Sequence, residues 1–338
     1  MTIRMELGER SYPIFLESGT LGKAGELFDL RRKVLIVTDG GVPPEYARTV
    51  AMAAEAPVLV TVPAGEGSKS FEKLEDLLGA MLEHGFTRHD CAVAVGGGVV
   101  GDLTGFAASL YMRGIDFYNI PTTLLSEVDS SIGGKTAVDF RGTKNTVGTF
   151  WQPKAVLIDP AALATLPRRQ LSAGMAEALK MSLTSDAELF RVFEEEDPFL
   201  CLPRVIEGAL RIKKAVVEAD EREVGLRKIL NFGHTLGHAI ESVLSPDLLH
   251  GECVALGMLP MCSEALRRRL IPIYEKLGLP SSVSAPSSAI REAMLHDKKS
   301  GKGGIDAVFV DEPGICRIGT ESADALIERY ESVFGRKR

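Results

Sequence analysis

The chain has 338 residues, 45% of them hydrophobic and 25% charged, a composition that is typical of a globular protein and excludes a mostly disordered or collagen-like chain. At roughly 150 residues per domain, this length favours two domains. The formal net charge of -7, from 39 Lys and Arg against 46 Asp and Glu, argues against a general nucleic-acid binder, which needs a basic excess.

Strands and helices alternate along the first half of the chain. Runs of β-branched and apolar residues predict strands at 2–7, 12–16, 33–38, 58–62, 91–95, 117–120 and 156–158. Residues 71–81 carry apolar side chains at helical spacing between two of these strands. Such alternation is typical of βαβ units, so we expect an α/β domain with a mostly parallel sheet over residues 1–160.

After residue 160 the pattern becomes helical. Helical periodicity covers residues 170–196, 204–224, 230–244, 252–269 and 286–296. One strand pair is predicted there, joining 305–310 to 316–318. We therefore expect a second, mainly α-helical domain over residues 161–338.

Neither the N-terminus nor the cysteines point to secretion. Charges lie within the first ten residues with no apolar segment, so we expect no signal peptide. The chain contains five cysteines, at 91, 201, 253, 262 and 316. They form no CxxC pair and their number is odd, which indicates free thiols in a reducing compartment. The weakly charged run 91–112 is interrupted by Asp102, which favours a buried strand and helix over a membrane span. A cytoplasmic protein without a membrane partner is expected.

A glycine motif, Gly96-x-Gly98-x-x-Gly101, follows a predicted strand and begins a helix. Glycines at such a turn let backbone N–H groups approach a pyrophosphate, which indicates dinucleotide binding. The alternative is a plain tight turn, because the motif follows a later strand and no ribose-binding acid lies about 20 residues on. Asp102 and the loop 65–69 add polar groups at the same sheet edge, where ligands bind in open α/β sheets.

A second glycine-rich turn, Gly133-Gly134-Lys135-Thr136, is similar to the end of a Walker A loop. That motif needs glycine where this chain has Asp129, which argues against a P-loop NTPase. A lysine beside flexible backbone can bind an oxyanion, and the alternative is a solvated turn lysine.

Acidic and imidazole side chains recur in the predicted helical domain. Glu177 and Lys180 share one helix face, and an isolated pair of this kind is by default a surface ion pair. Asn231, His234, His238 and Glu241 share another helical stripe, and His250 begins the next helix. Three histidines so close together favour a metal site over hydrogen-bonded core histidines, although the spacing does not show which two bind.

Basic residues gather near these motifs and indicate an enzyme that acts on a polyanion, although an isolated Lys or Arg is by default a solvated surface charge. They are Arg113, Lys135, Lys144, Lys180, Lys213, Arg227 and Lys298.

Six segments in order resemble the 3-dehydroquinate synthase family, and the similarity covers about residues 33–300. They are GGGVVGDLTGFAASLYMRG (96–114), PTTLLSEVDSSIGGKTAVDF (121–140), GTKNTVGTFWQP (142–153), AGMAEALK (173–180), GLRKILNFGHTLGHAIE (225–241) and HGECVALGM (250–258). The resemblance implies an N-terminal Rossmann-like NAD-binding domain and a C-terminal helical domain that binds a metal and the substrate. This fold is shared distantly with metal-dependent glycerol dehydrogenases.

The resemblance also implies the reaction. The family converts 3-deoxy-D-arabino-heptulosonate 7-phosphate to 3-dehydroquinate and phosphate, the second step of the shikimate pathway to chorismate and aromatic amino acids. The expected course is transient oxidation by NAD, E1cB elimination of phosphate, re-reduction, ring opening and intramolecular aldol closure.

The family's metal ligands match Glu177, His234 and His250 of this chain, for one divalent metal, zinc or cobalt. The match makes Glu177 a metal ligand rather than an ion-pair partner. It also places His238 near the substrate phosphate, so that the two histidines of the HxxxH pair are not expected to chelate together.

The family's other functional residues also carry over position by position. The NAD matches are Asp39, Glu66, Lys69, Gly97, Gly98, Val99, Asp102, Thr122, Thr123, Lys135 and Lys144. The substrate matches are Arg113, Asp129, Lys135, Asn145, Lys180, Lys213, Arg227, Asn231, His238 and Lys298. Arg113 is expected to reach the site of a second copy, so the resemblance implies a homodimer.

Three alternatives remain. Other sugar phosphate cyclases share the scaffold but tend to differ at the positions of Asn231, His238 and Lys298, where this chain matches the synthases. A metal-dependent polyol dehydrogenase would need no phosphate site. A catalytically inactive NAD-binding regulator is opposed by the intact set of metal ligands.

Overall fold

The computed structural model describes residues 1–297 and 304–335, and for 296 and 297 only the backbone. The chain divides into two compact units, Met1–Leu166 and Pro167–Arg338. Assigning NAD to the first unit and the metal and substrate to the second remains a prediction.

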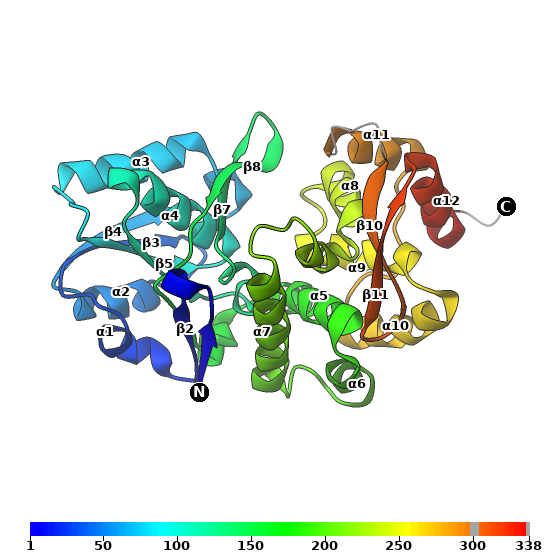
Figure 1. Cartoon of the computed structure of the whole chain (residues 1–338), viewed down its shortest axis with the longest axis horizontal. Coiled ribbons are helices and arrows are strands. Elements are labelled where there is room, and N and C mark those ends of the chain that lie inside the picture. Colours follow the sequence, from blue (N-terminus) through cyan, green and yellow to red (C-terminus); the bar gives the residue numbers. More distant parts are fainter. Residues whose placement is uncertain (298–303, 336–338) are drawn as a thin grey trace. The chain divides into compact units, whose positions relative to one another are not determined.

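Unit 1 is built on a seven-stranded sheet (Figure 1). In spatial order its strands are β1 (Thr2–Met5), β2 (Tyr12–Leu16), β9 (Ala155–Ile158), β6 (Asp116–Pro121), β5 (Cys91–Gly96), β3 (Lys33–Asp39) and β4 (Ala56–Val62). Only the β1–β2 hairpin is antiparallel, and the other neighbouring pairs run parallel. All strands expected in this half of the chain are present.

Helices cover both faces of this sheet. Val34 and Ile36 of β3 pack in one core cluster with side chains of α1 (Ala24–Leu27) and α2 (Pro44–Ala53). Leu35 and Val37 pack in a second cluster with α3 (Phe71–Glu83) and α4 (Gly98–Leu110). Figure 1 shows these two helix pairs on opposite sides of the strands. Because successive side chains of a strand point to opposite faces, a strand covered on both faces reads as a continuous apolar run.

Parallel strands bring the segments that follow them to one edge of the sheet. Candidate NAD residues in the loops there are Glu66, Lys69, Gly97, Thr122 and Thr123, whereas Gly98, Val99 and Asp102 lie in the first turns of α4. The short turns of unit 1 are η1 (Gly8–Arg10), η2 (Thr20–Lys23), η3 (Glu66–Ser68), η4 (Tyr111–Arg113), the π-helical η5 (Ser126–Ser130) and η6 (Pro160–Thr165).

A hairpin in unit 1 was not predicted. It consists of β7 (Lys135–Phe140) and β8 (Thr143–Phe150), which form a separate two-stranded sheet. The hydrophobic signal was weak because most residues of β8 are exposed. The glycine-rich turn at 133–134 thus leads into a strand and not into the helix of a Walker A loop.

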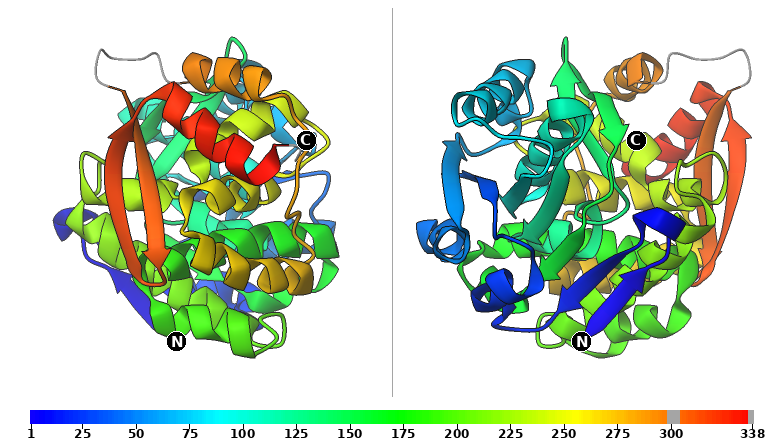
Figure 2. Two further views of the ribbon diagram at one scale, coloured as in Figure 1. Left: turned by 90° about the vertical axis from the view of Figure 1, so that its right-hand side faces the viewer. Right: turned by 60° about the vertical axis from the view of Figure 1, so that its left-hand side comes forward.

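Unit 2 is mainly helical, so the expected fold class is confirmed. Its helices and turns are α5 (Arg168–Ser185), α6 (Ala187–Glu195), α7 (Leu202–Ala219), η7 (Leu226–Asn231), α8 (His234–Leu244), α9 (His250–Met258), η8 (Leu259–Met261), α10 (Glu264–Leu277), α11 (Ser287–Asp297) and α12 (Ala323–Phe334). Figure 2 shows α12 beside the ribbon of β10 (Ile305–Glu312) and β11 (Ile315–Glu321), which was expected as a hairpin.

The helix expected over 230–244 begins only at His234, because Gly233 has a φ of 77°, and Asn231 belongs to the preceding turn η7 instead of the helical stripe. Two other helices expected as single elements are broken. The helix expected over 170–196 ends at Ser185, and Asp186 caps the next one by accepting from the N–H groups of Glu188 and Leu189. The helix expected over 252–269 is interrupted after Met258, and Ser263 caps α10. In both cases the helical spacing of apolar residues continues across the break, but a capping side chain begins a new helix there. No helix among the described residues is long and apolar enough to span a membrane.

Candidate active site

The candidate dinucleotide-binding turn of unit 1 lies at the N-terminus of α4. Strand β5 ends at Gly96 and α4 begins at Gly98, as the glycine motif predicted. The first N–H groups of a helix lack partners within the helix and bind anions such as pyrophosphate. A Cβ on Gly97 would lie 3.0 Å from Thr123 Cγ2, so the loop after β6 packs closely on this turn.

Several candidate NAD residues meet beside this turn. Lys69 Nζ lies 2.7 Å from Asp102 Oδ2 and 3.8 Å from Glu66 Oε1, and it also donates to Asn145 Oδ1. Lys69 is only 4% exposed. Burial by itself would lower the pKa of Lys69, but Asp102 and Glu66 raise it, so the ammonium stays charged. The loop after β6 is fastened by a 3.0 Å hydrogen bond from Thr122 N to Gly96 O.

Three other candidate residues of unit 1 are more exposed than Lys69. The Asp39 carboxylate accepts a 2.7 Å hydrogen bond from Gly41 N at the end of β3. Lys144 is exposed on β8. Arg113 is exposed in a turn with three successive positive φ angles, 49° at Met112, 68° at Arg113 and 116° at Gly114.

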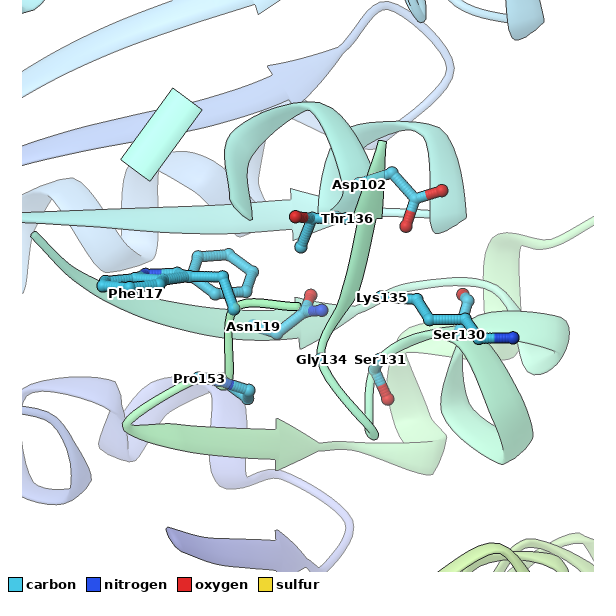
Figure 3. Close-up of a pocket in the computed structure, with 11 residues that line it drawn as sticks. Asp102, Phe117, Asn119, Ser130, Ser131, Gly134, Lys135, Thr136 and Pro153 are labelled. Atoms are coloured by element: carbon cyan, nitrogen blue, oxygen red, sulfur yellow. The ribbon is translucent and has the colours of Figure 1, made fainter. Parts of the chain in front are cut away.

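A small pocket of unit 1 is lined in part by the start of β7 (Figure 3), and both polar and apolar side chains contribute to it. Its lining includes Asp102 and Lys135, together with Asn119 of β6 and Ser130 of η5. Among the described residues, neither Asn119 Oδ1 nor Ser130 Oγ has a hydrogen-bond partner. Such a pocket suits an ordered water between the candidate NAD and substrate residues.

The π-helical turn η5 carries Asp129, a half-buried candidate substrate residue. The turn also holds Glu127, which is fully buried and has no hydrogen-bond partner for either oxygen among the described residues. Burial, reinforced by Asp159, raises the pKa of Glu127 well above its usual range. Glu127 was missed because its neighbours read as ordinary loop residues.

The three predicted metal ligands come together in unit 2. Glu177 of α5 is fully buried, and its Oε1 lies 3.8 Å from His234 Nε2 and 3.3 Å from His250 Nε2. Lys180, 1% exposed and one turn further along α5, has its Nζ 2.6 Å from Glu177 Oε2. Glu177 and Lys180 thus form a pair inside the protein and not on its surface.

The histidine nitrogens that would bind a metal are defined by the contacts of the opposite nitrogens. His234 Nδ1 lies 3.2 Å from Phe232 O, and His250 Nδ1 lies 2.9 Å from Glu241 Oε2. Both oxygens can only accept, so each Nδ1 carries a proton and each Nε2 faces Glu177. Glu177 Oε1 faces both Nε2 atoms and is the oxygen placed to bind a cation with them, whereas Oε2 lies 2.6 Å from the Lys180 ammonium.

The charges of this cluster are strongly coupled. Burial by itself would raise the pKa of Glu177, but Lys180, His234 and His250 lower it well below its usual range. Burial and the Lys180 ammonium lower the pKa of His234, so this imidazole is neutral. Burial opposes the protonation of His250, yet its contacts with Glu177 and Glu241 raise its pKa to about 10. A carboxylate and imidazole nitrogens are a donor set that fits zinc.

His238 also lies close to this cluster. Its ring centroid lies 5.2 Å from that of His234 and 5.7 Å from that of His250. One nitrogen from each of the three rings can be chosen so that all lie within 4.8 Å of one another. Two donor sets are therefore present, one with Glu177 and one with His238, and the ligand assignment remains a prediction.

The other candidate substrate residues of unit 2 are mostly buried. Lys213 of α7 is 5% exposed and Arg227 of η7 is 2% exposed. The backbone N–H of Arg227 donates to Asp220 Oδ2 at 3.0 Å. Asn231 Nδ2 donates to Glu223 Oε1 at 2.6 Å. Lys298 lies outside the described residues.

Two supporting residues were missed. Glu252 accepts a 2.8 Å hydrogen bond from Leu249 N and two from Arg169, at 2.6 Å from Nε and 2.7 Å from Nη2. These bonds tie the start of α9, and thus His250, to α5. A glutamate in the first turn of a helix is a known capping signal and could have revealed this role.

Comparison with known proteins identifies the family of this chain. Residues 59–173 match the family model for the 3-dehydroquinate synthase N-terminal region, and residues 174–300 match that for its C-terminal region. The chain is 43% identical over 325 residues to the 3-dehydroquinate synthase of Desulforamulus reducens, covering 88% of this chain and 90% of that protein. The chain belongs to the 3-dehydroquinate synthase family. The expected function, 3-dehydroquinate synthesis in the shikimate pathway, is confirmed by this membership.

A second curated relative supports the same family, and solved structures share its fold. The 3-dehydroquinate synthase of Latilactobacillus sakei is 41% identical and covers 98% of this chain and 99% of its own. Among solved structures, 2-epi-5-epi-valiolone synthase from Streptomyces hygroscopicus, with NAD+ and Zn2+ bound, has a TM-score of 0.86 at 30% identity, covering 96% of this chain and 97% of its own. A glycerol dehydrogenase from Sinorhizobium meliloti, at 18% identity and TM-score 0.62 over 96% of this chain and 97% of its own, shares the fold alone.

Proposed function

We propose that the chain converts 3-deoxy-D-arabino-heptulosonate 7-phosphate into 3-dehydroquinate and phosphate, with NAD and one divalent metal as cofactors. The observation that carries this proposal is the buried Glu177 carboxylate, 3.3 Å from His250 Nε2 and 3.8 Å from His234 Nε2. The identity of 43% to a named 3-dehydroquinate synthase supports the same reaction.

We assign the metal to Glu177, His234 and His250 and assign His238 to the substrate. When bound, the metal would act as a Lewis acid on the substrate hydroxyls and NAD would accept and return a hydride. Lys180 keeps Glu177 ionised, because its ammonium lies 2.6 Å from the carboxylate. Glu241 holds His250 in the tautomer whose Nε2 faces Glu177.

We assign NAD to unit 1. The N-terminus of α4 would bind the pyrophosphate through backbone N–H groups, and Thr122 and Thr123 line the neighbouring loop. The Lys69–Asp102 pair orders the polar loop after β4 next to the same turn. The bound NAD+ and Zn2+ of the valiolone synthase support this pair of cofactors.

Basic residues would bind the two anionic groups of the substrate. We assign the substrate carboxylate to Lys213 and Arg227, since a guanidinium forms two parallel hydrogen bonds to a carboxylate. We assign the phosphate to Lys135, Asn145, Asn231, His238, Lys298 and Arg113 from a second copy of the chain. The substrate phosphate can itself take the proton at C6, so no side chain is assigned as the general base.

We further propose a cytoplasmic homodimer. Arg113 lies in an exposed turn whose neighbour Met112 is 47% exposed, and this turn would meet the second copy. Light scattering of the purified protein should give twice the chain mass, and a monomer with full activity would contradict this assignment.

The reaction is tested by supplying the heptulosonate phosphate with the metal-loaded enzyme and catalytic NAD. We expect phosphate and 3-dehydroquinate in equal amounts, without net NADH. NADH in stoichiometric amounts without phosphate would favour a polyol dehydrogenase instead.

Another sugar phosphate cyclase activity remains the second candidate, because the valiolone synthase is 30% identical at a TM-score of 0.86. A seven-carbon ketose 7-phosphate without a carboxylate distinguishes the two. Turnover of this compound at the rate of the heptulosonate would contradict the assignment of Lys213 and Arg227 to a carboxylate.

A further inference from the structure

The ladder of the β7–β8 hairpin is interrupted opposite Asp139. Val138 pairs with Val147, but the next pair joins Phe140 to Thr143. One residue on β7 therefore faces three on β8, the segment 144–146, which is a β-bulge. The bulge contains Lys144 and Asn145, which are assigned above to NAD and to the substrate phosphate.

Asn145 has a backbone conformation that the bulge must stabilise. Its φ of 54° lies in the left-handed region, which costs energy for a residue other than glycine. Its N–H lies outside the regular ladder and donates to Asp139 Oδ1 at 2.8 Å. The Asp139 carboxylate thus supplies the acceptor that a regular strand partner would have supplied.

Asp139 also binds the loop that carries Lys69. Its N–H donates to Lys69 O at 2.8 Å. The Lys69 side chain in turn donates to Asn145 Oδ1. The three residues therefore form a closed ring of hydrogen bonds, in which Asp139 contacts both the loop after β4 and the bulge.

We propose that Asp139 is a positioning residue for the reaction: it holds the bulge 144–146 so that Asn145 stays beside Lys69. Bulges near functional sites commonly re-aim side chains, and this one would direct a phosphate ligand and an NAD ligand toward one another. The inference rests on the proposed function, because the roles of Asn145 and Lys69 come from it. Asp139 itself touches neither NAD nor substrate in this proposal.

The test uses the full-length, metal-loaded enzyme and compares Asp139→Ala with Asp139→Asn. Alanine removes the acceptor, whereas asparagine keeps an Oδ1 atom at the same distance from the backbone. We expect Asp139→Ala to raise the KM for NAD and to lower kcat, each about tenfold, because misplaced ligands bind and orient less well. Asp139→Asn should stay within about threefold of the wild type, since the hydrogen bond to a neutral acceptor is only moderately weaker.

Asp76→Ala is the matched control. Asp76 is an exposed carboxylate of unit 1 that pairs with Lys73 on α3, so its removal changes the net charge by the same amount. Kinetic constants of Asp76→Ala should equal those of the wild type. Metal content should be unchanged in all variants, because the assigned metal ligands belong to unit 2.

Several outcomes would overturn the inference. They are wild-type kinetics in Asp139→Ala, equal losses in the alanine and asparagine variants, and a lower Tm with unchanged kcat and KM. Should Asp139→Ala prove insoluble, Asp139→Ser must show an intermediate loss, since its shorter hydroxyl does not reach the same position. A wild-type enzyme without turnover contradicts the proposed function instead, and direct titration with NAD then still tests whether Asp139 supports Lys69.

Discussion

Glu241 holds the imidazole of His250 in place, with Oε2 2.9 Å from Nδ1. Glu241 lies on α8 and is only 8% exposed, while His250 begins α9. The contact orients the opposite nitrogen, Nε2, toward Glu177 and makes it a stronger donor. Carboxylate–histidine pairs of this kind commonly support metal ligands.

Removing this support should weaken metal binding. We expect Glu241→Ala to lower the affinity for zinc about 10- to 100-fold. Glu241→Gln keeps an acceptor and should lose less. Competition with a chromogenic chelator measures both affinities, and an alanine variant with wild-type affinity would show that Glu241 does not support a metal ligand.

A methyl group at Gly251 should disturb the assembly of the metal site. A Cβ there would lie 2.0 Å from Ala173 O, so α9 must move away from α5. We expect Gly251→Ala to lower the free energy of unfolding by about 2 kcal/mol and to reduce bound zinc. Chemical denaturation and metal analysis check these two effects.

Gly79→Ala is the control for that substitution. Gly79 lies within α3, and a Cβ there would meet no atom within 4 Å. Because alanine favours a helix over glycine, this variant should be about 0.5–1 kcal/mol more stable than the wild type. A loss of stability in both variants would show that the glycine effect is not specific to the α5–α9 contact.

Glu127 should make the protein less stable as the pH rises. Burial, reinforced by Asp159, raises its pKa in the folded state, so the folded chain binds a proton that the unfolded chain releases above its own pKa of about 4.3. The contribution of Glu127 is therefore most favourable below that pH. As the pH rises from there, the free energy of unfolding falls by about 1.4 kcal/mol per pH unit until the pH reaches the raised pKa of Glu127 in the folded state.

Glu127→Gln removes this titration. At acidic pH the variant should match the wild type, and at pH 8 it should be the more stable of the two. Urea denaturation across the pH range measures the difference. An identical pH dependence in both proteins would mean that Glu127 is ionised or solvated in the folded state.

Lys69 should contribute to NAD affinity without affecting the metal. Lys69→Met leaves Asp102 without the ammonium that lies 2.7 Å away and removes a donor to Asn145. We expect NAD to bind about tenfold more weakly while zinc content stays constant. Lys73→Met, four residues further along, is the control, since Lys73 pairs with Asp76 on α3. Equal NAD affinities in the two variants would contradict the assignment of Lys69.

Local patterns in the sequence determined most elements of unit 1. Strands 33–38 and 91–95 were evident because both sheet faces are covered, so the side chains of residues 34–37 and 91–95 are all apolar. The turn between Gly96 and Gly98 was evident because strand, glycines and helix are contiguous in the chain. The β7–β8 hairpin was not predicted, since exposed strands with functional side chains carry little hydrophobic signal.

Local sequence patterns did not predict how the metal cluster is assembled. The histidine spacing indicated a site, but by itself it left Glu177 as a surface ion-pair partner. Only packing brings α5 against α9 at Gly251 and buries Glu177 between Lys180 and the imidazoles. The support of His250 by Glu241, and of the start of α9 by Arg169 and Glu252, likewise depends on contacts between helices. Periodicity reports which face of an element is buried, whereas the tertiary structure decides what that face meets, because close packing depends on shapes far apart in the chain.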